Sequence, residues 1–434
     1  MLKHMALASL FILSGCADFW NSYQVINLDA AGTPSDAGTG ADASVTSGCT
    51  IDTPYIQNGD TFTTCCFVNN SELSGDNMYR TIEKAQQQNI VSPRILIGCP
   101  EPRELPVRSL ASGAALGEES ALPIVYKNVT IDGNGSSLNA NGLNRHFLVT
   151  TQGSLVLQNL TLKNGLARGT PSGASWPMLL PTSQGLNMAC GGSIVSGGDL
   201  RLINVLLTKN EARHEIIAAG GAICIGNRIL KLENSVIYDN LANHEGGTGE
   251  AKGAAVYLYN GSAEVAHSTV LQNTNLSKAS NYSAAAFHFG ETGATKTGSF
   301  VSKNSLFVNF FADAYVNSSA NYAIYFSCPL GLSKTQLPSM LASTTYDAVL
   351  IMETCGTSAK ALDSGLGIKW TGNKWPEPSG VQTQISPNGM WDDLFRPKSD
   401  LDYCNKIPRD YFGNSRIPAP GKPCMPGAVE PRTN

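Results

Sequence analysis

The sequence predicts an all-β protein built as a parallel β-helix solenoid, on two observations. The first is a phrase that recurs: LRLINVLLTKN (200–210) and LKLENSVIYDN (230–240) match position for position at an offset of 30 residues, and AEVAHSTVLQN (263–273) follows at an offset of 33. The second is that apolar and polar residues alternate within each phrase, which is typical of strands. Recurrence at this period indicates that each unit is one coil of a stack.

Two earlier units extend the repeat, IVYKNVTIDGNG (124–135) and SLVLQNLTLKNG (154–165). Aligning all five units predicts three columns of side chains that point into the stack. Coils in such a stack lie about 4.8 Å apart, so the members of one column would touch each other. The columns are Ile124, Leu155, Leu200, Leu230 and Ala263; Tyr126, Leu157, Leu202, Leu232 and Val265; and Ile131, Leu162, Leu207, Ile237, Val270 and Phe307.

A polar step separates the two strands of each unit, and it is Asn in four of them. Asn tolerates left-handed backbone and can hydrogen-bond to its neighbour in the next coil. His267 takes this place in the fifth unit, and we expect a structural, hydrogen-bonding role for it. The four residues are Asn128, Asn159, Asn204 and Asn234.

Glycines open another strand of each coil, with Gly191-Gly192, Gly220-Gly221 and Gly253 at equivalent places. If Ile194, Ile223, Val256 and Phe287 point inward, the outer face of these strands carries no carboxylate. General acid–base or metal-assisted catalysis on that face would need such charged groups. On that face His288 is expected as a surface aromatic residue. The outward residues would be Val195, Cys224, Tyr257 and His288.

The N-terminus reads as an export signal with a lipid anchor. Lys3 and His4 precede a short apolar run, 5–13, that is too short to span a bilayer. The residues LSGC that end at Cys16 resemble the lipobox of bacterial lipoproteins, which implies cleavage before Cys16 and its lipidation. The alternative is an ordinary signal peptide that contains a Cys. We expect a bacterial cell-envelope protein, anchored to the outer membrane or cell surface.

The composition bears on which partners the protein binds and on whether its cysteines form disulfides. Thirty Lys and Arg against 34 Asp and Glu give a net charge of −4, so no basic excess points to nucleic acid. Ten cysteines remain after Cys16, and an even number in an exported chain favours disulfides. We expect pairing within three groups, and Cys404 with Cys424 in the last. The groups are Cys49, Cys65, Cys66 and Cys99; Cys190 and Cys224; and Cys328, Cys355, Cys404 and Cys424.

The repeats together resemble right-handed parallel β-helix proteins of the pectin-lyase fold. NMYRTIEKAQQQ (77–88) resembles the short helix that caps such stacks, and DYFGNSRIPAPGKPCMPGAVEP (410–431) resembles the ending of the choice-of-anchor Q subgroup, with slightly different spacing. Residues 313–400 match poorly. The resulting division is a signal peptide (1–15), a lipidated and flexible linker (16–48), a cap and first coil (49–123), β-helix coils (124–312) and an irregular C-terminal region with a cap (313–434).

This resemblance bears on function only broadly, because the scaffold hosts many activities. Enzymes of the fold are lyases, hydrolases and epimerases of acidic polysaccharides, but the motifs expected of galacturonases or pectate lyases are missing here. We therefore expect a non-catalytic role in adhesion, display, or binding of a glycan or surface protein. The alternative is a polysaccharide lyase or a related carbohydrate-active enzyme.

One constellation is a candidate site. The pairs His214-Glu215 and His244-Glu245 lie 30 residues apart, and each begins four residues after an Asn. In register, they would stand on successive loops, with Arg168 in the corresponding loop one coil earlier. Two imidazoles and two carboxylates so placed could hold a divalent metal, Ca²⁺ or Zn²⁺, or shuttle protons. The alternative is that these are solvated loops with no shared role.

Overall fold

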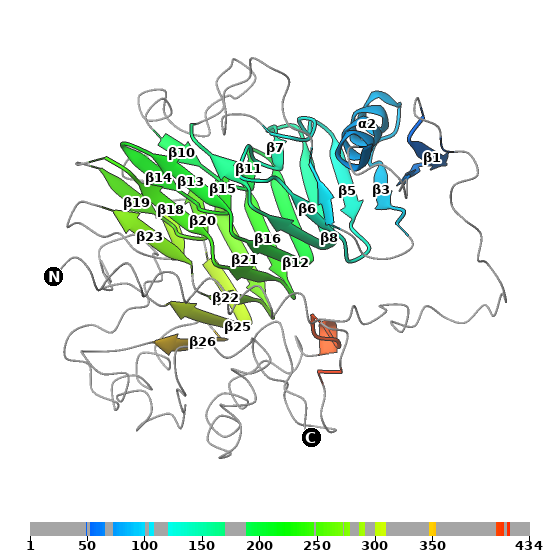
Figure 1. Ribbon diagram of the computed structural model, residues 1–434. Coiled ribbons are helices and arrows are strands. Elements are labelled where there is room, and N and C mark those ends of the chain that lie inside the picture. Colours follow the sequence, from blue (N-terminus) through cyan, green and yellow to red (C-terminus); the bar gives the residue numbers. More distant parts are fainter. Residues whose placement is uncertain are drawn as a thin grey trace, which may run out of the picture.

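The computed structural model consists mainly of parallel β-strands, with a helix near its N-terminal end (Figure 1). Several expectations lie outside the described residues: the signal peptide (1–15), Cys16, the linker 16–48 and the Cys404–Cys424 pair. The structure describes residues 49, 53–65, 73–99, 104–107, 120–169, 188–246, 249–271, 273–277, 286–290, 300–309, 347–352, 405–411 and 415–416.

The largest sheet, here the main sheet, contains 14 of the described strands. Its strands pair in parallel, except that β1 and β2 are antiparallel. Its strands are β1 (Tyr55–Asn58), β2 (Thr61–Thr64), β3 (Arg94–Ile97), β4 (Glu104–Pro106), β5 (Asn128–Asp132), β6 (Ser137–Asn139), β8 (Ser154–Lys163), β12 (Asp199–Thr208), β16 (Ile229–Glu233), β17 (Val236–Tyr238), β21 (Ser262–Ala266), β22 (Thr269–Leu271), β25 (Phe300–Asn309) and β26 (Asp347–Met352).

Three smaller parallel sheets stack beside it, each named here by one strand. Successive repeats pass from the main sheet to the β13 sheet, then to the β14 sheet and the β15 sheet, before returning. The β13 sheet contains β9 (Leu166–Ala167), β13 (Glu211–His214), β18 (Leu241–His244) and β23 (Thr274–Ser277); the β14 sheet contains β10 (Met188–Cys190), β14 (Ile217–Ala219) and β19 (Glu250–Lys252); the β15 sheet contains β7 (Phe147–Val149), β11 (Ile194–Ser196), β15 (Ile223–Gly226), β20 (Val256–Tyr259) and β24 (Phe287–Gly290).

The core lies between the main sheet and the β15 sheet. The predicted columns from Leu155 onward are in register, since Leu200 pairs with Leu155 and Leu230, and Leu202 with Leu157 and Leu232. The predicted inward residues of the β15 sheet are also correct. They join the leucines in one buried cluster whose β15-sheet members include Phe147, Ile194, Ile223, Val256 and Phe287.

The first unit was placed wrongly by the sequence alignment. Ile124 and Tyr126 are 43% and 44% exposed, and the residues that extend the first two columns are Val129 and Ile131, which pair with Leu155 and Leu157. Leu138 then occupies the third column, opposite Leu162. Asn128 is likewise exposed rather than part of the polar step. The offset between these two units is therefore 26 residues in the first two columns and 24 in the third, not 31.

The outer face of the β15 sheet is covered rather than exposed to solvent. The sequence-based expectation of an open outer face was therefore wrong. The β14 sheet covers it, and Val195, Cys224 and Tyr257 are buried in a second apolar cluster with Met188 and Cys190. His288 is half-buried and stacks on Tyr257, with ring centroids 5.5 Å apart. Burial lowers the pKa of His288 to about 3, with Lys252 adding to the effect. This residue is therefore not a surface aromatic.

A glycine with left-handed backbone turns the chain from the β14 sheet into the β15 sheet. Gly191, Gly220 and Gly253 have φ angles of 65°, 57° and 60°. A Cβ atom on Gly191 would lie 2.2 Å from the carbonyl oxygen of Ile194, so no other residue fits this turn without displacing backbone. The glycines noted in the sequence thus place one sheet directly against the other.

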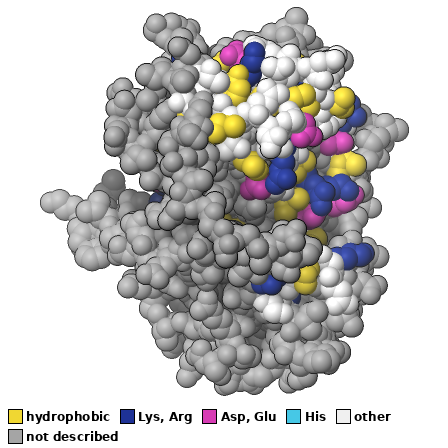
Figure 2. All heavy atoms as spheres, turned by 90° about the vertical axis from the view of Figure 1, so that its right-hand side faces the viewer, with side chains coloured by type: hydrophobic (Ala, Val, Ile, Leu, Met, Phe, Trp, Pro, Cys, Tyr) yellow, Lys and Arg dark blue, Asp and Glu magenta, His cyan; other side chains and the backbone are white. Residues whose placement is uncertain are grey.

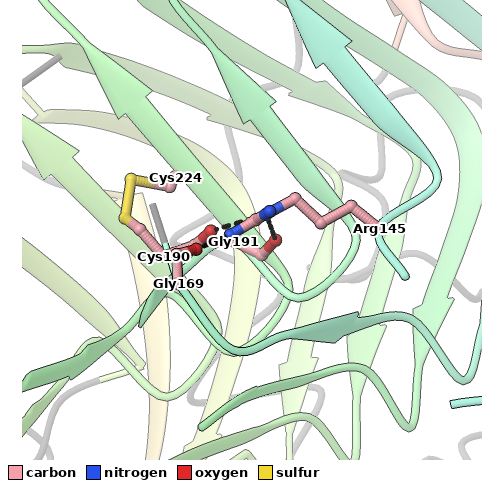
Figure 3. Close-up of a disulfide and its surroundings, with 5 residues drawn as sticks. All are labelled: Arg145, Gly169, Cys190, Gly191 and Cys224. Atoms are coloured by element: carbon pink, nitrogen blue, oxygen red, sulfur yellow. Dashed lines mark hydrogen bonds between the residues drawn. A yellow bond between two sulfur atoms is a disulfide. The ribbon is translucent and has the colours of Figure 1, made fainter. Parts of the chain in front are cut away.

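The same corner is reinforced by a disulfide and a buried arginine (Figure 3). Cys190 in β10 is bonded to Cys224 in β15, as expected. Arg145, which is fully buried, donates from Nε to the carbonyl oxygens of Cys190 and Gly191, each at 3.1 Å, and from Nη2 to that of Gly169. The two ends of the segment between Gly169 and Cys190 are thereby held to one guanidinium.

Near the N-terminus, Cys49 is bonded to Cys65, which agrees with pairing inside the first group, and Cys99 is also disulfide-bonded.

The helix α2 (Leu73–Gln87) matches the expected cap. Its buried residues Met78 and Ile82 belong to the core cluster.

The polar step of the repeats forms a ladder of side-chain amides. Asn234 donates to Asn204 at 2.5 Å, Asn204 to Asn159 at 3.1 Å, and Asn159 to Asp132 at 3.1 Å. All three asparagines and His267 have left-handed backbone, with φ between 47° and 53°. His267 is fully buried, in keeping with the structural role expected of it.

Strand pairing extends past the expected end of the repeats at residue 312. β26 pairs in parallel with β25, so at least residues 347–352 of the region expected to be irregular belong to the main sheet. Figure 1 shows α2 at one end of the stack and β26 at the other.

Candidate functional site

The two His-Glu pairs lie at the ends of neighbouring strands, in the predicted register: His214 and His244 are the last residues of β13 and β18, and Glu215 and Glu245 follow them. β13 and β18 pair in parallel with His214 directly opposite His244. A buried amide ladder just before these strands fixes the register: Asn210 donates to Asn240 at 2.9 Å, and Asn240 to Asn273 at 2.8 Å. All three asparagines are at most 4% exposed. The register that places His214 opposite His244 is therefore confirmed.

His244 acts as a packing residue rather than a ligand. Only 1% of it is exposed, and its Nε2 lies 2.8 Å from the carbonyl oxygen of Glu215. Gly246 and Gly249 lie so close to the ring that a Cβ atom on Gly249 would come within 2.4 Å of Nε2. The imidazole thus joins two successive loops through a backbone contact.

His214 is less buried, but its Nδ1 is occupied as well. The backbone N–H of Ile216 donates to it at 3.0 Å. Burial lowers the pKa of His214 and the nearby His244 lowers it further, while Glu215 opposes both effects. The ring is therefore neutral at neutral pH, with its Nδ1 lone pair used within its own loop.

The carboxylate of Glu245 is paired with an arginine, but not with Arg168. Arg213 Nε lies 3.4 Å from Glu245, and the same guanidinium binds both carboxylate oxygens of Glu211, at 2.8 and 2.7 Å. Asn243 also donates to Glu211 at 2.9 Å. We call these outward residues of β13, of β18 and of the position just after β18 the β13 face: Glu211, Arg213, Asn243 and Glu245.

Arg168 lies one repeat earlier than Arg213. It follows Ala167, the last residue of β9, which pairs with Ala212, so Arg168 holds the position equivalent to that of Arg213 in β13. Arg168 is exposed, whereas Arg213 is half-buried by its ion pairs. Arg213, rather than Arg168, therefore balances the charge of Glu245.

These contacts argue against a metal centre at the two His-Glu pairs. Within the described ranges, no group of three or more His, Cys, Asp or Glu side chains is placed to hold a metal ion. The physical reason is that the ring nitrogens named above and Glu245 already have protein partners. A Ca²⁺ or Zn²⁺ ion bound by His214, Glu215, His244 and Glu245 would have to break those contacts first.

A separate pair, His146 and Ser193, lies in the core and has no access to a substrate. His146 Nδ1 is 2.9 Å from Ser193 Oγ, and His146 Nε2 is 3.0 Å from the carbonyl oxygen of Leu138. Both side chains are 0% exposed. Burial lowers the pKa of His146 to about 4, so the ring stays neutral at neutral pH. This pair joins the β15 sheet to the main sheet and cannot meet a polysaccharide.

Charged side chains are interspersed by sign on the face of the molecule seen in Figure 2. On the main sheet, Arg201 binds both oxygens of Glu233, at 2.8 and 2.9 Å, and Lys231 pairs with Glu264 at 2.8 Å. A nucleic-acid interface needs a basic patch or stripe on one face. These paired charges give no support to one.

Sequence reasoning found the position of the β13 face but missed its central residue. Arg213 precedes His214 directly, and the same alternation that places Ala212 inside places Glu211 and Arg213 outside. The sequence signal that could have identified it is the two-residue spacing of Glu211 and Arg213, because residues two apart lie on the same side of a strand. It predicts an ion pair on one side of a strand, without any histidine.

In the part of the chain that the structure describes, no helix is both long and apolar enough to cross a membrane. Comparisons with protein-family models, with curated proteins and with solved structures found no match to this chain.

Proposed function

We propose that this protein is a surface-anchored bacterial lipoprotein whose stacked strands wind as a right-handed parallel β-helix, and that it binds a glycan without cleaving it. The observation that carries the proposal is the β13 face. It presents a half-buried guanidinium, two carboxylates and an amide that hold one another in place. Such preorganised donors and acceptors suit the hydroxyl groups of a sugar, because little side-chain ordering remains to oppose binding.

The same geometry favours binding over catalysis. General acid–base chemistry needs a side chain within hydrogen-bond reach of the substrate proton. His244 is buried against a backbone carbonyl, and His214 accepts a backbone N–H with Nδ1. A polysaccharide lyase is the second candidate, resting on the solenoid resemblance, and a surface protein is the other possible partner.

The test is binding to immobilised acidic and neutral polysaccharides. Arg213→Ala removes the central donor of the β13 face, and we expect binding to weaken about tenfold or more, as for loss of a hydrogen bond to a charged group. Arg201→Ala is a matched control, because Arg201 binds Glu233 in the same two-pronged way on the main sheet. We expect it to bind as the wild type does.

Equal binding by Arg213→Ala and Arg201→Ala would contradict the β13 face as the glycan site. Incubation of the same polysaccharides with and without Ca²⁺ tests the lyase candidate. Unsaturated products that are lost in the His214→Ala variant would favour that candidate over a binding protein.

The anchor is a separate prediction at Cys16. Because the thioether to lipid forms only on that sulfur, Cys16→Ser should leave the protein outside the membrane fraction after cell lysis. Ser14→Ala, two residues earlier, keeps the sulfur and should remain membrane-bound. Membrane retention of Cys16→Ser with its leader still attached would show that the segment is not a lipoprotein signal.

A further inference from the structure

The C-terminal turn, residues 405–411 and 415–416, is organised around one buried arginine. Arg416 is 0% exposed, and its backbone N–H donates to the carbonyl oxygen of Pro408 at 2.8 Å. Its Nε donates to the carbonyl oxygen of Arg409 at 3.1 Å. The side chain therefore holds the turn together before it reaches any other part of the molecule.

The same guanidinium reaches the main sheet. Arg416 Nη2 donates to Oδ1 of Asn234, a residue 182 positions earlier. Asn234 is only 3% exposed and is the member of the amide ladder nearest the C-terminal end of the chain. Its carboxamide oxygen thus receives a charged donor in a site that water barely reaches.

The ladder has a direction, and its two ends carry opposite charges. Each amide donates toward the preceding repeat, from Asn234 through Asn204 and Asn159 to the carboxylate of Asp132. Arg416 supplies a cation at the accepting oxygen of Asn234, while Asp132 supplies an anion at the other end. Hydrogen bonds in such a chain polarise one another in the same sense, so both ends favour one orientation of every amide.

A second contact of the turn reaches a different strand. Tyr411 hydrogen-bonds to the side chain of Thr161 in β8, and burial raises the pKa of Tyr411 to about 12. β8 pairs with β12, and β12 with β16, whose last residue Glu233 directly precedes Asn234. The turn therefore touches the first of three successive strands and the residue that directly follows the third.

From these contacts we infer that the C-terminal turn is a strap that couples repeats which do not touch each other. In a stack of repeats each unit contacts only its neighbours, so local opening can start at one repeat without the others. Because the strap contacts both Thr161 and Asn234, opening of one of these three repeats would disturb the other two. Residues from the end of the chain thereby set the local stability of its middle.

Hydrogen exchange in the full-length protein, followed by mass spectrometry, tests the strap. Arg416→Gln removes the charged donor, and we expect exchange at about tenfold the wild-type rate or more in peptides that cover β8, β12 and β16. Arg409→Gln is the matched control, because Arg416 uses only the backbone carbonyl of that exposed residue. In the Arg409→Gln variant we expect β8, β12 and β16 to exchange at the wild-type rate.

Tyr411→Phe keeps the arginine and removes the other contact, so it serves if Arg416→Gln does not fold. It should speed exchange in β8 more than in β16. Faster exchange confined to residues 405–416 in either variant, or equal effects of Arg416→Gln and Arg409→Gln, would overturn the strap and leave a turn that merely rests on the sheet. Neither outcome depends on glycan binding.

Discussion

Replacing Leu232 by Asp is expected to prevent folding of the central repeats. Leu232 is 0% exposed and lies in register between Leu202 and Val265, both buried. A carboxylate there would have aliphatic neighbours on both sides, and burying it unpaired costs several kcal/mol, a large part of a typical stability of about 5–15 kcal/mol. Circular dichroism and urea unfolding should show loss of the native transition at pH 7.

Lys231→Asp is the control one residue away. Lys231 points outward and pairs with Glu264 at 2.8 Å, with both side chains about half exposed. Losing this pair and placing two carboxylates near each other should cost about 1 kcal/mol or less, because solvent screens exposed charges. If both variants lost the same stability, the register of β16 would be wrong.

The central repeats could be predicted because their pattern is strict, and the first unit could not because its pattern is ambiguous. Both 124–126 and 129–131 place apolar residues two positions apart. What decides between them is α2: Gln86 donates to the carbonyl oxygen of Ile124 at 3.0 Å and accepts from the N–H of Tyr126 at 2.9 Å. Val125, between them, is then the residue that points inward. A contact with a helix nearly 40 residues earlier leaves no mark in the local pattern.

The β14 sheet was missed for a different reason. Its strands are three residues long, too short to show a period, and their central residues are the alanines Ala189, Ala218 and Ala251. Small side chains let this sheet pack tightly against the β13 sheet, where Ala212 and Ala242 face them. The sequence therefore suggested an open face on the β15 sheet where a covered one exists.

For the candidate site, the sequence predicted positions but not chemistry. The Asn ladder at Asn210 and Asn240 repeats visibly, so the stacking of His214 on His244 followed from it. The partner of His244, however, is the backbone carbonyl of Glu215, and a backbone acceptor has no residue type to recognise. Which imidazoles are engaged could be learned only from the three-dimensional arrangement.

Arg145→Met is the second substitution with a large expected effect. It keeps an unbranched stem as far as the position of Nε but leaves the carbonyl oxygens of Gly169, Cys190 and Gly191 without the guanidinium that now donates to them. Since Arg145 is fully buried, water cannot readily replace it, and we expect a loss of about 3–5 kcal/mol in the free energy of unfolding. Urea denaturation followed by far-ultraviolet circular dichroism measures the loss.

The disulfide beside Arg145 provides a test of how this corner works. Cys190→Ala with Cys224→Ala opens a loop of 34 residues and should cost about 2–4 kcal/mol. Arg145 and the disulfide both hold β10 against β15. Removing either one already loosens β10, so removing the second as well has less left to disrupt. The triple variant should therefore lose less stability than the sum of the two separate losses, by about 0.5–3 kcal/mol. Losses that simply add would mean that the guanidinium and the disulfide stabilise separate parts of the molecule, and that Arg145 acts mainly through Gly169.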